Sequence, residues 1–156
     1  AAGLMLFFCN RRLKKQVHAG RETEQVLCEQ LAFQRRFLDG IPSPIFVCDL
    51  QGAVITCNQS YEERMSIKLE HIRGQNSIGM NIFPQKLAEQ LHCEIMQMIL
   101  SRQPYYQKRM IEIKSGPMEI YQWTVPFYSA SGRLEGLVGG WFDISEVRKW
   151  DPRATW

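Results

Sequence analysis

The chain has 156 residues, of which 45% are hydrophobic and 22% are charged, which suits one packed domain with an additional helix. Its net charge of +3 is far below the basic surplus of nucleic-acid-binding domains, so no nucleic-acid partner is predicted. The five cysteines are scattered, without a CxxC pair or zinc-type spacing. This pattern favours free thiols over a disulfide framework and predicts no metal site.

The first nine residues are apolar or small, and the basic segment 10–15 with four cations follows them directly. A transmembrane helix that leaves the bilayer on its cytoplasmic side has this pattern, whereas a signal peptide carries its cations before the apolar run. Because a span needs about 20 residues, 1–9 are predicted to be only the end of a transmembrane helix. A buried strand beside a basic loop is the alternative. The chain begins with Ala, so we expect it to be a piece of a longer protein.

Residues 10–38 are predicted to form a juxtamembrane linker helix, because they lack proline and are rich in Glu, Gln, Arg, Lys and Leu. A heptad stripe of apolar residues runs along this segment and is interrupted at Gly20 and Glu24. Its members are Leu13, Val17, Leu27, Leu31 and Leu38. Two interpretations stay open: the helix packs on its own domain, or it pairs with its twin in a homodimer. Gly40 and Pro42 end the helix.

Residues 39–149 are predicted to form the main domain. Two β-rich runs, 45–49 and 53–57, flank a turn that contains Gly52, and Asn58 follows in a helix N-cap position. Residues 66–83 are predicted to be short helical turns and loop. A helix from Pro84 to about Arg102 carries one apolar face, formed by Leu87, Leu91, Ile95, Met98 and Ile99.

Three strands complete the domain, predicted over 105–114, 119–128 and 135–144 with turns at 115–117 and 129–132. The order of elements predicts an α+β fold: a five-stranded antiparallel sheet with helices on one face and a core or cavity between them. Residues 150–156 include Pro152 and are predicted to be an atypical tail.

Several of these motifs resemble PAS domains: the strand pair with a central glycine, the Asn after the second strand, and Asp143-Ile144-Ser145-Glu146 before an outgoing helix. Four segments are similar to the cytoplasmic PAS domain of BvgS-like virulence sensor kinases, namely 42–47, 57–58, 121–126 and 139–144. The resemblance covers about 33–148, and the order and spacing of the motifs are more specific than any one of them.

The resemblance implies a PAS fold preceded by a long signalling helix, within a transmembrane hybrid sensor histidine kinase of a two-component phosphorelay. Such proteins are homodimers in the bacterial inner membrane with the PAS domain on the cytoplasmic side. They autophosphorylate a histidine with ATP and pass the phosphate to a response regulator. The PAS domain relays or modulates the signal, and the residues implied for this relay are Trp141, Asp143, Ile144 and Glu146.

In the BvgS-like group, a cysteine at the end of the second strand and a histidine on the long helix line the cavity. This implies that Cys57 and His92 contact a ligand, and Asn58 at the same junction completes the candidate site. No cofactor is assigned; a small molecule, for example a quinone sensed by Cys57, is the hypothesis for the ligand, and haem is disfavoured. The alternatives are a buried apolar role for Cys57, a core or boundary role for His92, and helix capping by Asn58.

No catalytic residue is predicted. His71 lacks the following acid and the Thr-Pro of a phosphoacceptor box, and no glycine-rich ATP lid occurs, so enzyme activity is expected in the parent kinase and not in this segment. Two other classes stay open. One is a membrane-anchored PAS module with a different output, such as a cyclic-dinucleotide enzyme or a chemoreceptor. The other is an enzyme that acts on a molecule in the cavity.

Overall fold

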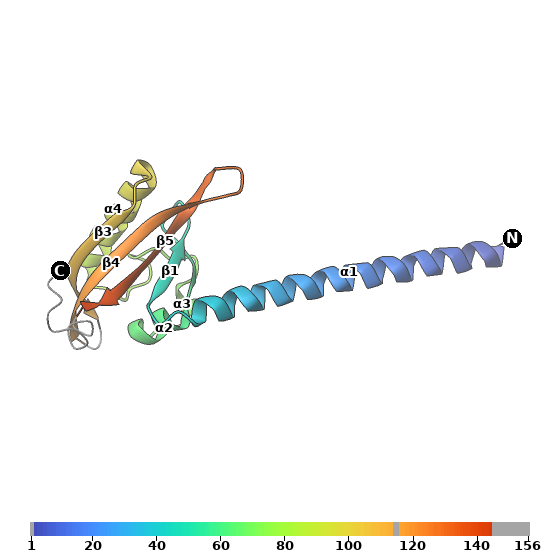
Figure 1. Ribbon diagram of the computed structural model, residues 1–156, viewed down its shortest axis with the longest axis horizontal. Coiled ribbons are helices and arrows are strands. Elements are labelled where there is room, and N and C mark those ends of the chain that lie inside the picture. Colours follow the sequence, from blue (N-terminus) through green and yellow to red (C-terminus); the bar gives the residue numbers. More distant parts are fainter. Residues whose placement is uncertain (1, 114–115, 145–156) are drawn as a thin grey trace. The chain divides into compact units, whose positions relative to one another are not determined.

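The computed structural model describes residues 2–113 and 116–144, with side chains from Lys14 onward (Figure 1). The helices are α1 (Ala2–Asp39), α2 (Gln59–Met65), α3 (Leu69–Ile72) and α4 (Gln85–Ser101). The strands are β1 (Ile45–Cys48), β2 (Val54–Cys57), β3 (Tyr105–Ile113), β4 (Gly116–Tyr128) and β5 (Leu134–Asp143). The chain divides into two compact units, Ala1–Phe37 and Leu38–Trp156, which are described separately below.

The predicted linker helix is present in the first unit as part of α1. Side chains four positions apart contact each other along this helix. The Gln25 amide donates a hydrogen bond to Glu29 at 3.2 Å, and His18 lies 3.5 Å from Glu22. The His18 side chain is 78% exposed, as expected of a solvated histidine. Among the described residues, no helix combines the length and the hydropathy that crossing a bilayer requires.

The second unit is built on a five-stranded sheet of order β2-β1-β5-β4-β3, in which all neighbours are antiparallel. The central strand β5 approaches β1 so closely that a Cβ on Gly136 would lie 2.0 Å from the Cys48 carbonyl oxygen. β4 alternates between its two faces, and the side chains buried on its inner face are Met118, Ile120, Gln122 and Thr124. The predicted sheet is therefore confirmed.

One predicted boundary is wrong. Pro117 was expected in a turn, but it lies within β4 and pairs with Glu112 of β3. Among the described residues, β5 pairs with β4 only from Ile120 onward, so no described strand pairs with that edge of β4 at Pro117. Such an edge accommodates a residue without an N–H, and the same holds for Pro126, which lies beyond the last β3 partner, Thr124.

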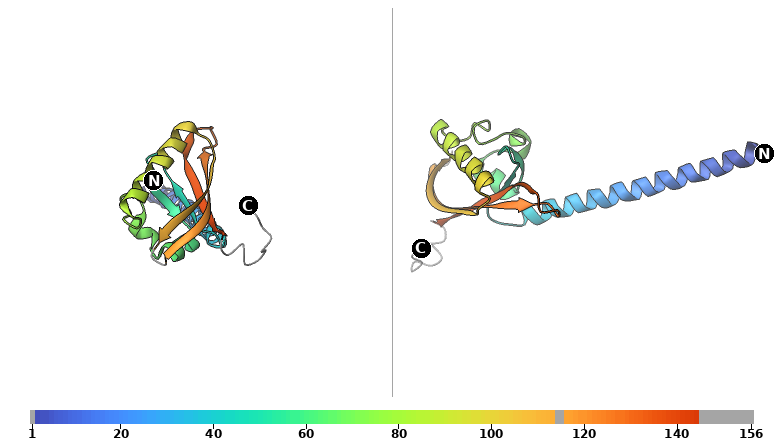
Figure 2. Two further views of the ribbon diagram at one scale, coloured as in Figure 1. Left: turned by 90° about the vertical axis from the view of Figure 1, so that its left-hand side faces the viewer. Right: turned by 90° about the horizontal axis from the view of Figure 1, so that it is seen from above.

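The helices α2, α3 and α4 lie over one face of the curved sheet (Figure 2). α2 begins at the N-cap Asn58 and ends at Ser66 in the left-handed conformation, while α4 begins after Pro84 and ends at Arg102, as predicted. The short helical turns expected in 66–83 include α3. The core fills the space between these helices and the inner face of the sheet; its largest cluster includes Val54, Cys57, Tyr61, Met65, Ile72, Ile120 and Trp141.

Candidate ligand cavity and signal-entry junction

A small cavity of about 60 Å³ lies between the inner face of the sheet and the helices. Its wall is mainly apolar: aromatic rings come from the strands, α2 and the loop before α4, and methionines from α2, the loop after α3, and α4. The aromatic and methionine residues are Phe46, Tyr61, Phe83, Trp141, Met65, Met80 and Met98. The predicted apolar face of the long helix contributes Leu91, Ile95 and Met98.

Three polar side chains interrupt this apolar wall. Ser77 is 3% exposed, and its Oγ is buried without a hydrogen-bond partner. Gln122 is 8% exposed and projects from the inner face of β4. Glu94 of α4 accepts a hydrogen bond of 2.5 Å from Arg109 of β3, and both side chains are largely buried. Arg109 Nη2 also donates to Gln107, so the guanidinium is held in place on the sheet.

The predicted ligand residues Cys57, Asn58 and His92 are not among the residues that line this cavity. Cys57 is 1% exposed and belongs to the core cluster. His92 Nδ1 is buried without a hydrogen-bond partner, and it packs beside Gly52, where a Cβ would lie 3.6 Å from that nitrogen. Contact of these residues with a ligand stays a prediction. The structure brings His92 close to the cavity's Gly52 edge.

The thiol that does line the cavity is Cys48 of β1, which sequence reasoning missed. Burial raises the pKa of Cys48 to about 11, against a smaller opposing effect of a backbone hydrogen bond at Leu137. Burial also raises the pKa of the Tyr61 hydroxyl well above its usual value, with a smaller contribution from Cys57. Both groups are therefore neutral at physiological pH, and the thiol is a poor nucleophile.

Other wall residues were also missed, for different reasons. Glu94 follows Leu91 by three positions and precedes Met98 by four, so helical spacing alone places it on the apolar face. Ser77 lies in an irregular loop, where no periodicity indicates which side chains point inward. Gln122 lies two positions from buried Ile120 and two from buried Thr124. Because every second residue of a strand faces the same side, this spacing would have placed Gln122 on the inner face.

Asn58 is completely buried and fully used as a structural link. Its Oδ1 accepts hydrogen bonds from the backbone N–H groups of Ile45 at 2.9 Å and Tyr61 at 3.0 Å. Its Nδ2 lies at 3.1 Å, 3.2 Å and 2.8 Å from three carbonyl oxygens of the segment before β1, those of Leu38, Ile41 and Ser43. The predicted helix cap is thus confirmed. The same amide also ties the end of α1 and the following loop to the domain.

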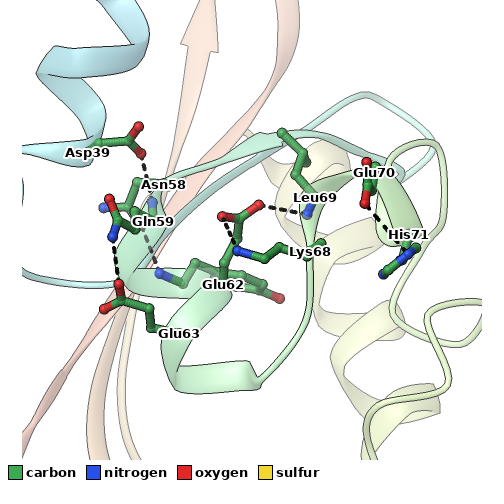
Figure 3. A network of polar contacts seen from close by, with 10 residues as sticks. Asp39, Asn58, Gln59, Glu62, Glu63, Lys68, Leu69, Glu70 and His71 are labelled. Carbon is green, nitrogen blue, oxygen red and sulfur yellow. Dashed lines mark hydrogen bonds and ion pairs between the residues drawn. The ribbon is translucent and has the colours of Figure 1, made fainter.

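A second set of polar contacts strengthens this junction (Figure 3). The carboxylate of Asp39, the last residue of α1, accepts a hydrogen bond of 2.7 Å from the backbone N–H of Gln59. Further along, Glu62 of α2 accepts from the backbone N–H of Leu69 at 2.8 Å and lies 3.8 Å from Lys68. His71 lies on α3 with a 71% exposed side chain, 3.8 Å from Glu70.

The predicted relay residues of β5 lie beside this junction, since the backbone N–H of Trp141 donates to the Pro44 carbonyl at 3.3 Å. Trp141 is 6% exposed, lines the cavity and packs edge-to-face on Tyr61, with ring centroids 5.2 Å apart. Asp143 lies 3.6 Å from Arg64 of α2, and Ile144 is buried. Glu146 and the predicted tail lie outside the described residues. Among the described residues, α2 therefore contacts both the entry junction, through Asn58, and the end of β5.

Comparison with known proteins identifies the fold. Residues 32–144 match the family model of the PAS fold. The chain belongs to the PAS family. It is 32% identical over 136 residues to the virulence sensor protein BvgS of Bordetella parapertussis, and 32% identical to BvgS of Bordetella bronchiseptica over the same length. Each of these two matches covers 86% of this chain. This PAS chain spans only 11% of the length of these curated relatives.

Solved structures agree with this assignment. The PAS domain of Bordetella pertussis BvgS superposes with a TM-score of 0.62 and 28% identity, covering 80% of this chain and 96% of that one. A phage VqmA–DPO complex gives a TM-score of 0.67 over 85% of this chain and 60% of that one. Its identity of 17% supports the PAS fold alone.

Proposed function

We propose that this chain is the sensory and relay domain of a transmembrane hybrid sensor histidine kinase, passing a signal from an incoming helix to a kinase. The observation that carries this proposal is the double use of Asn58. One side-chain amide caps α2 and also holds three carbonyl groups between the end of α1 and β1. A rotation or shift of α1 therefore acts directly on the start of α2.

From α2 the route continues to the exit strand. Arg64 lies 3.6 Å from Asp143, and Tyr61 packs on Trp141, so a displacement of α2 alters the contacts at the end of β5. In a PAS sensor this strand leads to the outgoing helix and the output domain. Two arrangements of α2 with different free energies are sufficient for a switch, and a ligand shifts their balance by binding one of them better.

The same proposal includes a homodimer joined along α1. This helix carries apolar side chains that are at least half exposed, namely Val17, Val26, Leu27, Leu31, Phe33 and Phe37. A unit that consists of one helix contains no second element against which its own stripe can be buried. Val17, Leu27 and Leu31 belong to the heptad stripe, and pairing with the same stripe of a second copy would remove these three side chains from water and couple the motions of two protomers.

The likeness to BvgS supports the wider setting. We infer that the parent protein lies in the bacterial inner membrane with this domain on the cytoplasmic side, and that it autophosphorylates and transfers phosphate to a response regulator. A PAS module with a cyclic-dinucleotide or chemoreceptor output is the competing function. The gene sequence beyond Trp156 separates them, because a phosphoacceptor histidine box is expected only for the kinase.

A chimera tests the relay directly. This chain replaces the matching segment of BvgS, and autophosphorylation is measured with the native Asn58 and with Asn58→Asp, which retains the acceptor oxygen but removes the donors to the Leu38, Ile41 and Ser43 carbonyls. We expect the native chimera to respond to BvgS signals and the variant to be fixed in one output state. Asn81→Asp makes the same charge change at an exposed position and should respond normally. A normal response of Asn58→Asp would refute the relay through this junction.

A further inference from the structure

The cavity contains a hydrogen-bonding group that the described chain leaves unsatisfied. Ser77 Oγ is buried and has no partner, although nearly all buried hydroxyl groups in proteins are hydrogen-bonded. Such a group destabilises the folded state unless a bound molecule supplies the missing bond. The Gln122 amide lines the same cavity and offers both a donor and an acceptor.

The charges around the cavity indicate that its ligand is uncharged. Among the described lining residues, Glu94 is the one acidic side chain and no lysine or arginine occurs, and Arg109 already pairs with Glu94 at 2.5 Å. Cys48 and Tyr61 stay protonated because burial raises both pKa values. A carboxylate or an ammonium group in this wall would find no unpaired countercharge, and it would lose its hydration.

The volume limits the size of the ligand. A cavity of about 150 Å³ accommodates benzene, whereas this cavity measures about 60 Å³. A quinone ring would have to displace part of the wall. Met65, Met80 and Met98 line the cavity, and methionine side chains adapt to an irregular occupant more readily than branched ones do. The wall thus suits a compact molecule of a few non-hydrogen atoms, and one of about five, similar in volume to benzene, would fit once these methionines are displaced.

We propose that this cavity binds a small uncharged molecule with a single hydroxyl, carbonyl or amide group. That group is hydrogen-bonded by Ser77 Oγ and the Gln122 amide, and the hydrocarbon part lies among the three methionines. The inference rests on the sensory function proposed above and adds the chemical class of the ligand, which neither the PAS fold nor the likeness to BvgS specifies.

Methionine methyl groups report on binding at this site. The full chain is labelled with ¹³C-methyl methionine and titrated with isobutanol, isobutyrate and isobutylamine, three probes with one carbon skeleton and different charges. We expect isobutanol to cause saturable shifts at Met65, Met80 and Met98, while Met110, which is 60% exposed, serves as an internal control. The two charged probes should bind at least about tenfold more weakly, as expected for unpaired charge in an apolar wall.

Two variants test the named polar groups. Ser77→Ala and Gln122→Met should each weaken isobutanol about fivefold, because each removes one hydrogen bond. Binding of xenon, which is apolar, should be unchanged or stronger. Ser77→Ala should also leave the melting temperature of the ligand-free chain unchanged or raised, since it removes an unsatisfied hydroxyl, and this shows that the variant is folded. Ser131→Ala, in an exposed turn, is the matched control.

Each result is decisive for the ligand class. Equal or tighter binding of a charged probe would show that the site is not selective for uncharged molecules. If both variants bind isobutanol as tightly as the native chain, isobutanol binds elsewhere in the protein. If none of the probes causes a saturable shift, the proposed site is refuted. These failures leave the relay untouched, because the BvgS chimera tests the relay without any added ligand.

Discussion

At the scale of single residues, Asn58 connects the start of α2 to β1 and to the segment before β1, which lie 13 to 20 positions earlier in the sequence. Its acceptor oxygen serves β1 and α2, and its donor nitrogen serves the segment 38–43. Its role as a helix cap could be predicted from its position after a strand. The bonds to Leu38, Ile41 and Ser43 could not, because they arise only when the loop folds back over the helix start.

Asn58→Asp should lower the stability of the domain by about 2–4 kcal/mol, because a completely buried carboxylate would face carbonyl oxygens in place of donors. Urea unfolding monitored by circular dichroism measures this loss. The exposed Asn81→Asp variant should unfold at the same midpoint as the native chain. An unaltered midpoint for Asn58→Asp would mean that the three carbonyl contacts contribute nothing to the folded state.

The cysteines should differ sharply in reactivity. Cys48 and Cys57 are buried, whereas Cys28 and Cys93 are exposed. In the native chain, iodoacetamide should therefore modify Cys28 and Cys93 first, and Cys48 and Cys57 only when the domain opens. Peptide mass spectrometry resolves the four sites, and urea should abolish the difference. Rapid native labelling of Cys57 would support its predicted redox role and contradict its position in the core.

The raised pKa of Cys48 predicts a dependence of stability on pH. Between the ordinary value of 9.0 and about 11, the folded state retains a proton that the unfolded state releases. The stability contributed by the neutral thiol is therefore fully present below pH 9.0 and declines as the pH rises toward about 11. Cys48→Ala should reduce the slope of unfolding free energy against pH in this window. An identical slope in the variant would assign the effect to other groups.

At the scale of secondary structure, the sheet depends on the close approach of β1 and β5. A Cβ on Gly136 would lie 2.0 Å from a backbone oxygen of β1, and one on Gly139 would lie 2.5 Å from the Phe46 ring. The sequence predicted most elements of the domain, because hydrophobic periodicity and the turn residues agree. It did not predict the contact between β1 and β5, since pairing between distant strands leaves no local signal.

Gly136→Ala should destabilise the domain by about 3 kcal/mol or more, because the new methyl group meets backbone that cannot move without breaking the β1–β5 pairing. Gly79→Ala is the matched control, since the nearest atoms to its Cβ would be side-chain oxygens, that of Gln75 at 2.6 Å, at the end of a flexible side chain, and that of Asn76 at 3.5 Å. Thermal unfolding compares the two variants. Similar melting temperatures would show that β1 and β5 separate easily, and the strand order would need revision.

At the scale of the whole molecule, the chain consists of a long helix and a PAS domain that form separate compact units. The sequence indicated this division through the Gly40 and Pro42 break. The candidate site was harder to predict. Cys57 and His92 were chosen by family resemblance, while the lining residues Cys48, Ser77 and Gln122 follow from the packing of the sheet against loop and helices.

Removal of residues 1–37 should leave the domain folded, with a melting temperature within a few degrees of that of the full chain, because its core and Asn58 contacts all lie after that point. Calorimetry on both chains at matched concentration measures the difference. Analytical ultracentrifugation of the same samples should show weaker dimerisation of the shortened chain. A collapse of the shortened domain would show that the helix is part of its core.

The two prolines of β4 have a consequence for self-association in crowded solution. Exposed strand edges are templates on which identical chains add to one another and aggregate. Within the described part of the chain, Pro117 lies where β5 no longer pairs with β4, and Pro126 lies where β3 no longer does. Both overhanging edges therefore carry a residue that has no N–H. Sheet growth across these overhangs is thereby disfavoured, which would protect the proposed homodimer, whose two copies stay close together.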